Sequence, residues 1–541
     1  MVSLICLMFE ITSEGLSRHH LRRPLTAERG VSAVNGSVFV VVSILQDDIN
    51  TSMMEAETNR NNNSNTSDRS FENLSAKRKD VAGSSQDVSE SKRSKISIDL
   101  RDEITTAGEK VKRALLPFCD VPYEDQLRRK ASDVRDAMVK FSWEVHRTCP
   151  KWRNWLKEQM KNHSGVLCEI EKIRPSPVLN AYRNKSEFTI ASSSNGTKER
   201  IVGFRVGSYR DGSSVVGEPY ACDNLPDSMK LIAKVFQQYV RQSQYDVYND
   251  QSHDGHWRQL IVRTSSQNDI MIIPVFYAQF LSDDEVDAEK AAMTEYFSDG
   301  DGVQCGVTSL YFRCLSNRLG SCRQHAVNEH LWGKKCITEV LLELSFHIYP
   351  DTFFSFNNPA AALLYTMVGD LCLEEPNNIV FNICCSTGTV ALSLAKRVKS
   401  VVAVDMWAAN IEEAKKNAEL NNVTNVVFHH AKAEEVTNQL DRWLKGQSAV
   451  AVLDSPCAEM QSKVIYALRR CHFIHRVIYI SCNPVAAIQN FTDLMRPKSQ
   501  TMKGKAFYPV KAIPVDLSPH TKLCVMVVMF KRRRFHTDMM C

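Results

Sequence analysis

The thiol of Cys482 is the side chain of this sequence best suited to covalent chemistry. It lies in the tetrapeptide Ser481-Cys482-Asn483-Pro484, directly after an apolar run at 477–480 that predicts a buried strand. Pro484 cannot continue a sheet ladder, so the strand is predicted to stop near Cys482. Ligands of open α/β sheets bind at this carboxyl end of the strands. Cys482 is therefore a candidate nucleophile, although a free cysteine is also a common apolar filler of protein cores.

A carboxylate stands at the end of the preceding predicted strand. Asp454 follows the apolar run at 449–453 and is followed by Ser455 and Pro456. Parallel neighbouring strands end at the same edge of a sheet, so Asp454 and Cys482 are expected to converge on one rim. The sequence thus predicts two chemically useful groups in a single site.

A loop of small residues precedes both groups and suits a cofactor. It links a strand ending near residue 383 to a helix, and its candidate binding residues are Cys384, Ser386, Gly388 and Thr389. Small residues let the backbone approach a ligand at the helix N-terminus. Asp405 ends the next strand about 20 residues on, where a carboxylate suits the two hydroxyls of a ribose. NAD and S-adenosyl-L-methionine (SAM) both fit such a scaffold, and the absence of a full GxGxxG favours SAM.

The elements that must position these groups alternate regularly from residue 339 to 541. Predicted strands at 377–383, 400–405, 425–430, 448–454 and 476–481 are separated by helical patterns. This order is typical of an α/β, Rossmann-like domain with a parallel sheet. Residues 165–338 instead show short apolar segments with turn signals at 195–196 and 211–212, which predict a mostly antiparallel β domain. Residues 100–164 have helical spacing and are interpreted as a supporting helical segment.

The first 99 residues predict a disordered, low-complexity tail. They are rich in Asn, Ser and charge between about 46 and 98 and cannot bury much apolar surface. Basic clusters at 77–79 and 92–95 resemble a bipartite nuclear import signal, although such clusters also arise by chance in basic tails. The expected location is the nucleus, the cytoplasm or both. Arginines at 22, 23 and 29 leave mitochondrial import as the weaker alternative.

Composition limits the class of protein. The chain has 541 residues, 43% hydrophobic and 24% charged, and a net charge of +5 that permits an anionic partner such as RNA. Its 17 cysteines lack paired or zinc-type spacing, which predicts free thiols in a reducing compartment and no metal site. The sequence contains no apolar stretch of about 18 residues, so no membrane-spanning helix is predicted.

Taken together, the motifs resemble the RNA uracil-C5 methyltransferases, and most of all the eukaryotic tRNA (uracil-5-)-methyltransferase family. The resemblance covers about residues 165–530. The segments that carry it are Ser176-Pro177 with Tyr182-Arg183-Asn184-Lys185-Ser186-Glu187-Phe188, Pro350-Asp351-Thr352-Phe353-Phe354 leading to Asn357, the loop at 384–389, Ser481-Cys482-Asn483-Pro484, and Val515-Asp516-Leu517 with Pro519-His520-Thr521. A generic small-molecule methyltransferase would not explain the β domain or the cysteine tetrapeptide.

This resemblance implies methyl transfer from SAM to C5 of uridine in the tRNA T-loop (position 54), through a covalent adduct between a cysteine and C6. It assigns the nucleophile to Cys482 and the orientation of the uracil or its loop to Asp454. It places Tyr182, Arg183, Asn184 and Lys185 on the tRNA, with the two cations on phosphates. The residues alone would favour a solvated turn for that tetrapeptide. The target uridine must leave its stack to reach such a pocket.

The sequence departs from the family pattern at five positions. In the cofactor region, Ser386 stands where the family has the first glycine of the loop, and Asp405 stands where it has a glutamate. Ser355 takes the place of a glutamine that contacts substrate or cofactor, and Cys457 that of an arginine. Val525 takes the place of the glutamate that removes the C5 proton.

Valine cannot accept a proton, so two functions remain open. One is an active methyltransferase with an altered release step, for which nearby Glu459 is a candidate substitute base. The other is a relative that binds tRNA, and SAM, without turnover.

Overall fold

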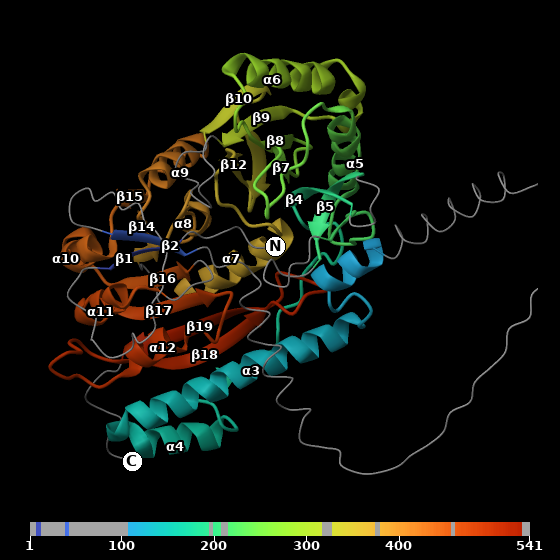
Figure 1. The fold of residues 1–541 in the computed structure, drawn as a ribbon. Helices are drawn as coiled ribbons and strands as arrows, with labels where there is room; N and C mark the ends of the chain where they lie inside the picture. Colours follow the sequence, from blue (N-terminus) through green and yellow to red (C-terminus); the bar gives the residue numbers. More distant parts are fainter. Residues whose placement is uncertain are drawn as a thin grey trace, which may run out of the picture. The chain divides into compact units, whose positions relative to one another are not determined.

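The computed structural model describes residues 7–11, 38–42, 107–193, 199–206, 215–315, 327–373, 379–455 and 460–532. The described residues from 107 to 532 form one compact unit (Figure 1). Within the predicted tail, the described residues are β1 (Leu7–Ile11) and β2 (Val38–Val42), which form an antiparallel pair. The two basic clusters lie outside the described residues. No helix in the described ranges has the length and hydropathy of a membrane span.

An eight-stranded sheet forms the α/β part of the unit, in the order β15-β14-β13-β16-β17-β19-β18-β3. Its first five strands are parallel and match the predicted alternation, whereas β19 runs antiparallel to β17 and β18. Continuous runs of branched apolar residues favour strands buried on both faces. The bounds are β13 (Ile379–Ile383), β14 (Ser400–Asp405), β15 (Val426–His430), β16 (Ala449–Ser455), β17 (Ile474–Ser481), β18 (Phe507–Val515), β19 (Val525–Arg532) and β3 (Glu169–Ile170).

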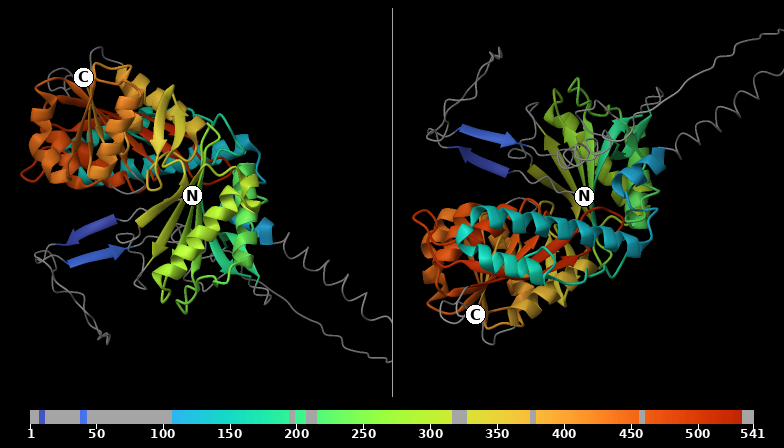
Figure 2. Two further views of the ribbon diagram at one scale, coloured as in Figure 1. Left: turned by 90° about the horizontal axis from the view of Figure 1, so that it is seen from above. Right: turned by 90° about the horizontal axis from the view of Figure 1, so that it is seen from below.

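Helices cover both faces of this sheet (Figure 2). One apolar core joins the face that includes Tyr479 to α10 (Ala433–Leu444), α11 (Ser462–Arg470) and α12 (Ile488–Met495). The other joins the face that includes Ile478 to α7 (Asn358–Leu373), α8 (Thr389–Ala395) and α9 (Ala408–Leu420). The Rossmann-like arrangement expected from the sequence is therefore present.

The helical segment before residue 165 packs on the α/β part. The helix α3 (Tyr123–Thr148) places Phe141 against Phe491 of α12, with ring centroids 5.4 Å apart, and α4 (Arg153–Asn162) follows it. The short strand β3 then pairs in parallel with β18. Residues 169–170 thus complete the α/β sheet, so the predicted boundary at 164/165 does not mark the start of the β domain. A further helix, at 107–115, contributes Val111 to the core of the β domain.

The β domain is a seven-stranded sheet in the order β10-β9-β8-β7-β4-β5-β6. It is antiparallel except for β8 and β9, which the helix α6 (Asp283–Ser298) connects, since parallel neighbours need a long crossover. The predicted turns at 195–196 and 211–212 lie outside the described residues, but the strands flanking each one pair antiparallel. The bounds are β4 (Lys185–Ser192), β5 (Arg200–Arg205), β6 (Val216–Gly217), β7 (Trp257–Thr264), β8 (Ile270–Tyr277), β9 (Ser309–Leu315) and β10 (Val327–Gly333), with α5 (Asp227–Gln242) packed beside them.

A separate hairpin and a shared core connect this domain to the α/β part. The strands β11 (Ile337–Leu341) and β12 (Leu344–Ile348) pair only with each other among the described strands. Their apolar side chains join one core that also includes Ile273 of β8 and Val368 of α7. The two parts are therefore packed directly against one another.

Candidate active site

The carboxyl ends of β16 and β17 bring Asp454 and Cys482 to one rim. In the parallel register Asp454 lies opposite Ile480, and Cys482 is the second residue after Ile480. Side chains alternate between the faces of a sheet, and Ile480 points into the core under α7 and α8. Asp454 therefore shares this face, and so does Cys482 if the alternation continues one residue past the strand. The register therefore places the ends of β16 and β17 side by side at one edge of the sheet, where the sequence predicts the two groups to meet.

A tight turn presents the Cys482 thiol. The strand β17 ends at Ser481, whose hydroxyl accepts a hydrogen bond from the Asn483 N–H at 3.2 Å. The Asn483 side chain in turn accepts one from the Ala486 N–H, leading into α12. Cys482 is half-buried, unlike the fully enclosed Cys471 and Cys524. A partly exposed thiol at a strand end fits a nucleophile better than a core filler.

Among nearby thiols, Cys384 is a poor competitor for this role. Burial, together with the negative charges of Asp405 and Asp454, raises the pKa of Cys384 to about 12. Its thiol therefore stays protonated at neutral pH, and the thiolate is the nucleophilic form.

Asp454 is a partly buried carboxyl group that faces neutral neighbours. Burial raises its pKa to about 6. Tyr365 of α7 and Cys384 interact with it electrostatically, and no described residue donates a hydrogen bond to it. Nearby, Asn490 of α12 binds the Met460 backbone, accepting from its N–H and donating to its carbonyl. Among the described residues, the Asp454 carboxyl therefore has no hydrogen-bond donor or cation that would hold it ionised.

Val525 lies on the other side of Cys482. The antiparallel register pairs Ser481 with Met526, so one further step places Cys482 beside Val525. Val525 packs against the same core as Ile480. The position that the resemblance assigns to a base is therefore adjacent to the candidate nucleophile Cys482 and carries only a hydrocarbon side chain.

The loop between β13 and α8 has the backbone form of a ligand cradle. Cys384, Ser386 and Gly388 have φ values of 60°, 48° and 85°. Two buried hydroxyl oxygens, Ser386 Oγ and Thr387 Oγ1, have no hydrogen-bond partner among the described residues. Unpartnered buried polar atoms are unusual in folded proteins and suit a polar ligand. The residues present therefore fit SAM, with Thr389 as the first residue of α8.

Asp405 is largely occupied by internal donors. Its Oδ2 accepts from the Ser386 N–H at 2.8 Å, and its Oδ1 accepts from the Trp407 N–H and the Asn410 amide. A carboxylate has about four acceptor positions, so one remains, on Oδ2. Binding both ribose hydroxyls, as predicted, would require an internal donor to give way. Trp407 itself is half exposed, just after the end of β14, and nothing in its sequence context marks it as a site residue.

The left-handed backbone at Ser386 gives a testable effect. A non-glycine residue there costs roughly 1–2 kcal/mol whether or not SAM is bound, so Ser386→Gly is expected to raise the melting temperature by relieving that strain. Gly388→Ala is the matched control with the opposite expectation, because its added Cβ would lie 3.1 Å from Ala414 Cβ at a positive φ. Melting curves measure the stability of both variants, and calorimetric titration measures their affinity for SAM. Weaker binding by Ser386→Gly would show that the Ser386 hydroxyl itself contacts the ligand.

The predicted RNA-binding tetrapeptide is mostly internal. Tyr182 is buried and donates its hydroxyl to the Pro519 carbonyl at 2.9 Å. Arg183 is buried with its guanidinium over the Phe356 ring, and burial lowers its pKa. The Asn184 amide donates to the Ser355 carbonyl at 2.8 Å. Direct phosphate binding by Arg183 therefore does not fit its position.

Lys185 differs from the three residues before it. It is half-buried and pairs with Glu187 at 2.9 Å. Because its side chain reaches the surface, Lys185 keeps the geometry that a phosphate contact requires.

These contacts join three segments behind the rim. Ser355 offers its carbonyl to the tetrapeptide and its hydroxyl to the Asn357 backbone. The buried Asn357 amide donates to the Leu517 carbonyl at 2.8 Å. Ser355 thus lies in a brace between the β domain and the loop at 516–521, which is a structural position that the prediction of a cofactor contact did not include.

A buried ion pair, absent from the sequence predictions, anchors the same loop. Lys130 of α3 and Asp516 are both fully buried and lie 2.7 Å apart. The Tyr123 hydroxyl donates to the second Asp516 oxygen, and Lys130 also donates to the Ser518 carbonyl. Gln126 binds both the backbone and the ring of His520, whose pKa burial lowers. The helix α3 therefore positions the loop that leads into Val525.

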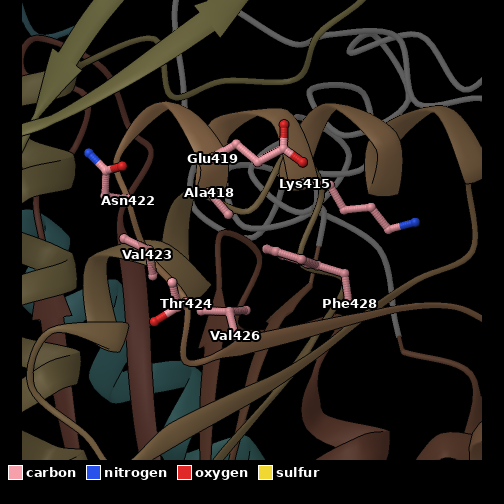
Figure 3. Close-up of a pocket in the computed structure, with 8 residues that line it drawn as sticks. All are labelled: Lys415, Ala418, Glu419, Asn422, Val423, Thr424, Val426 and Phe428. Carbon is pink, nitrogen blue, oxygen red and sulfur yellow. The ribbon is translucent and has the colours of Figure 1, made fainter.

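A separate cavity of about 410 Å³ lies between α9 and β15 (Figure 3). Its lining includes Lys415, Asn422 and Phe428, and none of the predicted site residues. It is therefore distinct from the candidate active site. Within the described ranges, no group of three or more His, Cys, Asp or Glu residues is arranged to hold a metal ion.

Comparison with known proteins places these features in context. Residues 334–507 match the family model described as tRNA (Uracil-5-)-methyltransferase. The chain is 39% identical over 423 residues to the human tRNA (uracil-5-)-methyltransferase homolog A, covering 78% of this chain and 68% of that one. It is 36% identical over 371 residues to human homolog B, covering 68% and 73%. The crystal structure of Pyrococcus abyssi tRNA (uracil-54, C5)-methyltransferase with S-adenosyl-L-homocysteine superposes with a TM-score of 0.54 at 21% identity, covering 76% and 83%.

Proposed function

The chain belongs to the tRNA (uracil-5-)-methyltransferase family, and on this premise we propose that it transfers a methyl group from SAM to C5 of uridine in the tRNA T-loop. The observation that carries the proposal is the shared rim of Asp454 and Cys482, with the open loop at 384–389 beside it. Bound SAM supplies an electrophilic methyl group. The residues described above would do the rest.

Cys482 is proposed to activate the uracil. Uracil C5 is a weak nucleophile, and addition of the Cys482 thiolate to C6 turns the ring into an enolate whose C5 is nucleophilic. The half-buried position of the thiol suits attack on a base that has left its stack. The loop residues Cys384, Ser386, Gly388 and Thr389, with Asp405, would hold the methyl donor against that face.

The β domain is proposed to bind the tRNA, with Lys185 as the candidate phosphate contact of the tetrapeptide. Tyr182, Arg183 and Asn184 would act indirectly, by holding the brace to residues 355–357 and 519. Phosphate contacts make affinity fall with salt, so Lys185→Ala is expected to reduce the slope of log affinity against log salt by about 1. An unchanged slope would show that Lys185 does not contact a phosphate of the tRNA.

Incubation with T-loop RNA and SAM tests the function. Methylated, released RNA supports the proposed reaction. A covalent complex that survives a denaturing gel supports the Cys482 adduct, because that bond resists denaturation. RNA binding with neither product would support the second candidate, a relative that binds tRNA without turnover, for which Val525 beside Cys482 is the favouring observation.

We also propose that the protein is located in the nucleus, the cytoplasm or both. Imaging of variants that lack residues 77–79 and 92–95 tests this location.

A further inference from the structure

The proposed reaction requires a base at the rim that removes the hydrogen of uracil C5 as a proton. After methyl transfer, uracil C5 carries both the methyl group and its original hydrogen. Aromatic uracil returns only when a base takes that proton. Val525, on the β19 side of Cys482, has no atom that accepts one. The base must therefore come from another direction.

The β16 side of Cys482 offers a carboxylate. Asp454 is the last residue but one of β16, and its register partner Ile480 is two residues before Cys482. Neighbouring strands lie about 4.8 Å apart and rise about 3.3 Å per residue, which puts the two Cα atoms about 8 Å apart. In the proposed adduct, a uracil ring bonded to sulfur through C6 would occupy that span with C5 directed toward β16.

We propose that Asp454 is the base that removes the C5 proton in this chain, an assignment that rests on the proposed function. The C5–H bond breaks and its proton passes to a carboxylate oxygen of Asp454. The electron pair of that bond forms the C5=C6 double bond, the C6–S bond breaks, and Cys482 leaves as a thiolate. Atoms and charge balance without a further reactant.

The environment of Asp454 supports the role. No described residue donates a hydrogen bond to it, so its oxygens are available to a substrate. Its pKa of about 6 comes from burial, and the groups that face it, Tyr365 and Cys384, are neutral at pH 7 because burial raises their pKa values further. A base with a pKa close to the working pH is efficient, and such a base typically contributes a factor of about 10² to 10⁴.

The test compares four proteins: wild type, Asp454→Asn, Val525→Glu and the double variant. The substrate is T-loop RNA carrying tritium at uridine C5, and the readouts are tritium release and covalent complex on a denaturing gel. Asp454→Asn is expected to form the adduct, to accumulate it, and to release tritium about 100-fold more slowly. The isosteric amide removes a buried charge, so a melting curve is expected to show a stable fold.

The double variant separates catalysis from positioning. Val525→Glu puts a carboxylate beside Cys482 from the opposite strand and is expected to restore tritium release to Asp454→Asn. Release by the wild type should also fall as the pH drops through about 6, since only the ionised carboxyl accepts a proton. Loss of the adduct itself in Asp454→Asn, without rescue, would overturn the assignment and indicate that Asp454 orients the uracil.

Failure of the assignment and failure of the function look different. Normal release by Asp454→Asn, in a protein that turns over, overturns only the role of Asp454. A wild-type protein that forms neither adduct nor methylated RNA overturns the proposed function, and this role with it.

Discussion

Cys482→Ala is expected to abolish both the covalent complex and methyl transfer, by at least roughly 1,000-fold in turnover. Alanine removes the only atom that bonds to uracil C6, and without that bond C5 stays too weak a nucleophile to take the methyl group. The backbone of the turn should persist, because the Ser481 hydroxyl and the Asn483 side chain accept hydrogen bonds from its N–H groups. Methylation assays and denaturing gels with T-loop RNA measure the effect.

Cys314→Ala is the matched control for this prediction. Cys314 is also half-buried, but it lies on β9 of the β domain, away from the rim. Its replacement should leave adduct and methylation within about twofold of wild type. Methylation that persists in Cys482→Ala would show that another group activates the uracil, and the rim would need a different nucleophile.

Lys130→Met is expected to destabilise the protein by about 3–5 kcal/mol. Methionine fills much of the same volume but leaves Asp516 fully buried, with the Tyr123 hydroxyl and the Ser518 N–H as its remaining donors. A buried carboxylate without its cation is costly. The Ser518 carbonyl also loses a donor. Thermal or denaturant unfolding monitored by circular dichroism gives the change.

Lys112→Met supplies the comparison for the buried pair. Lys112 pairs with Asp223 at 2.9 Å, but the Asp223 side chain is 46% exposed. Pairs with one solvated partner contribute little, so a loss below about 1 kcal/mol is expected. A loss equal to that of Lys130→Met would mean that burial is not what makes the pair with Asp516 important.

The sequence predicted the five parallel strands β13 to β17 because each contains a continuous apolar run and helical patterns separate them. It did not predict β18 and β19. Pro509 and Pro514 interrupt β18, and proline usually argues against a strand, yet β18 pairs along β19 with a shift in register between Pro509 and Lys511. In β18, the hydrogen bonds to β19 therefore outweigh the local preference of proline against strands.

The site was predictable where function lies within one short motif, and not where it depends on distant partners. Asp454 and Cys482 each follow an apolar run, so their shared edge follows from topology. Lys130 and Asp516 are 386 residues apart. The spacing of apolar residues along α3 does not show that Lys130, among the charged residues of that helix, is buried. The burial of Arg183 was not predicted for the same reason, since the Phe356 ring that covers it comes from a remote segment.

The pairing of β3 with β18 makes the β domain an insertion within the α/β fold. Residues 107–170 supply α3 and the last strand, and the chain returns to the same sheet only after the β domain. A fragment that starts at residue 339 would lack both. It would expose the unpaired edge of β18, which invites edge-to-edge association, and the apolar surface of α12 that Phe141 covers. Insolubility of such a fragment would reflect where it was cut, so domain dissection of this chain should retain residues 107–170.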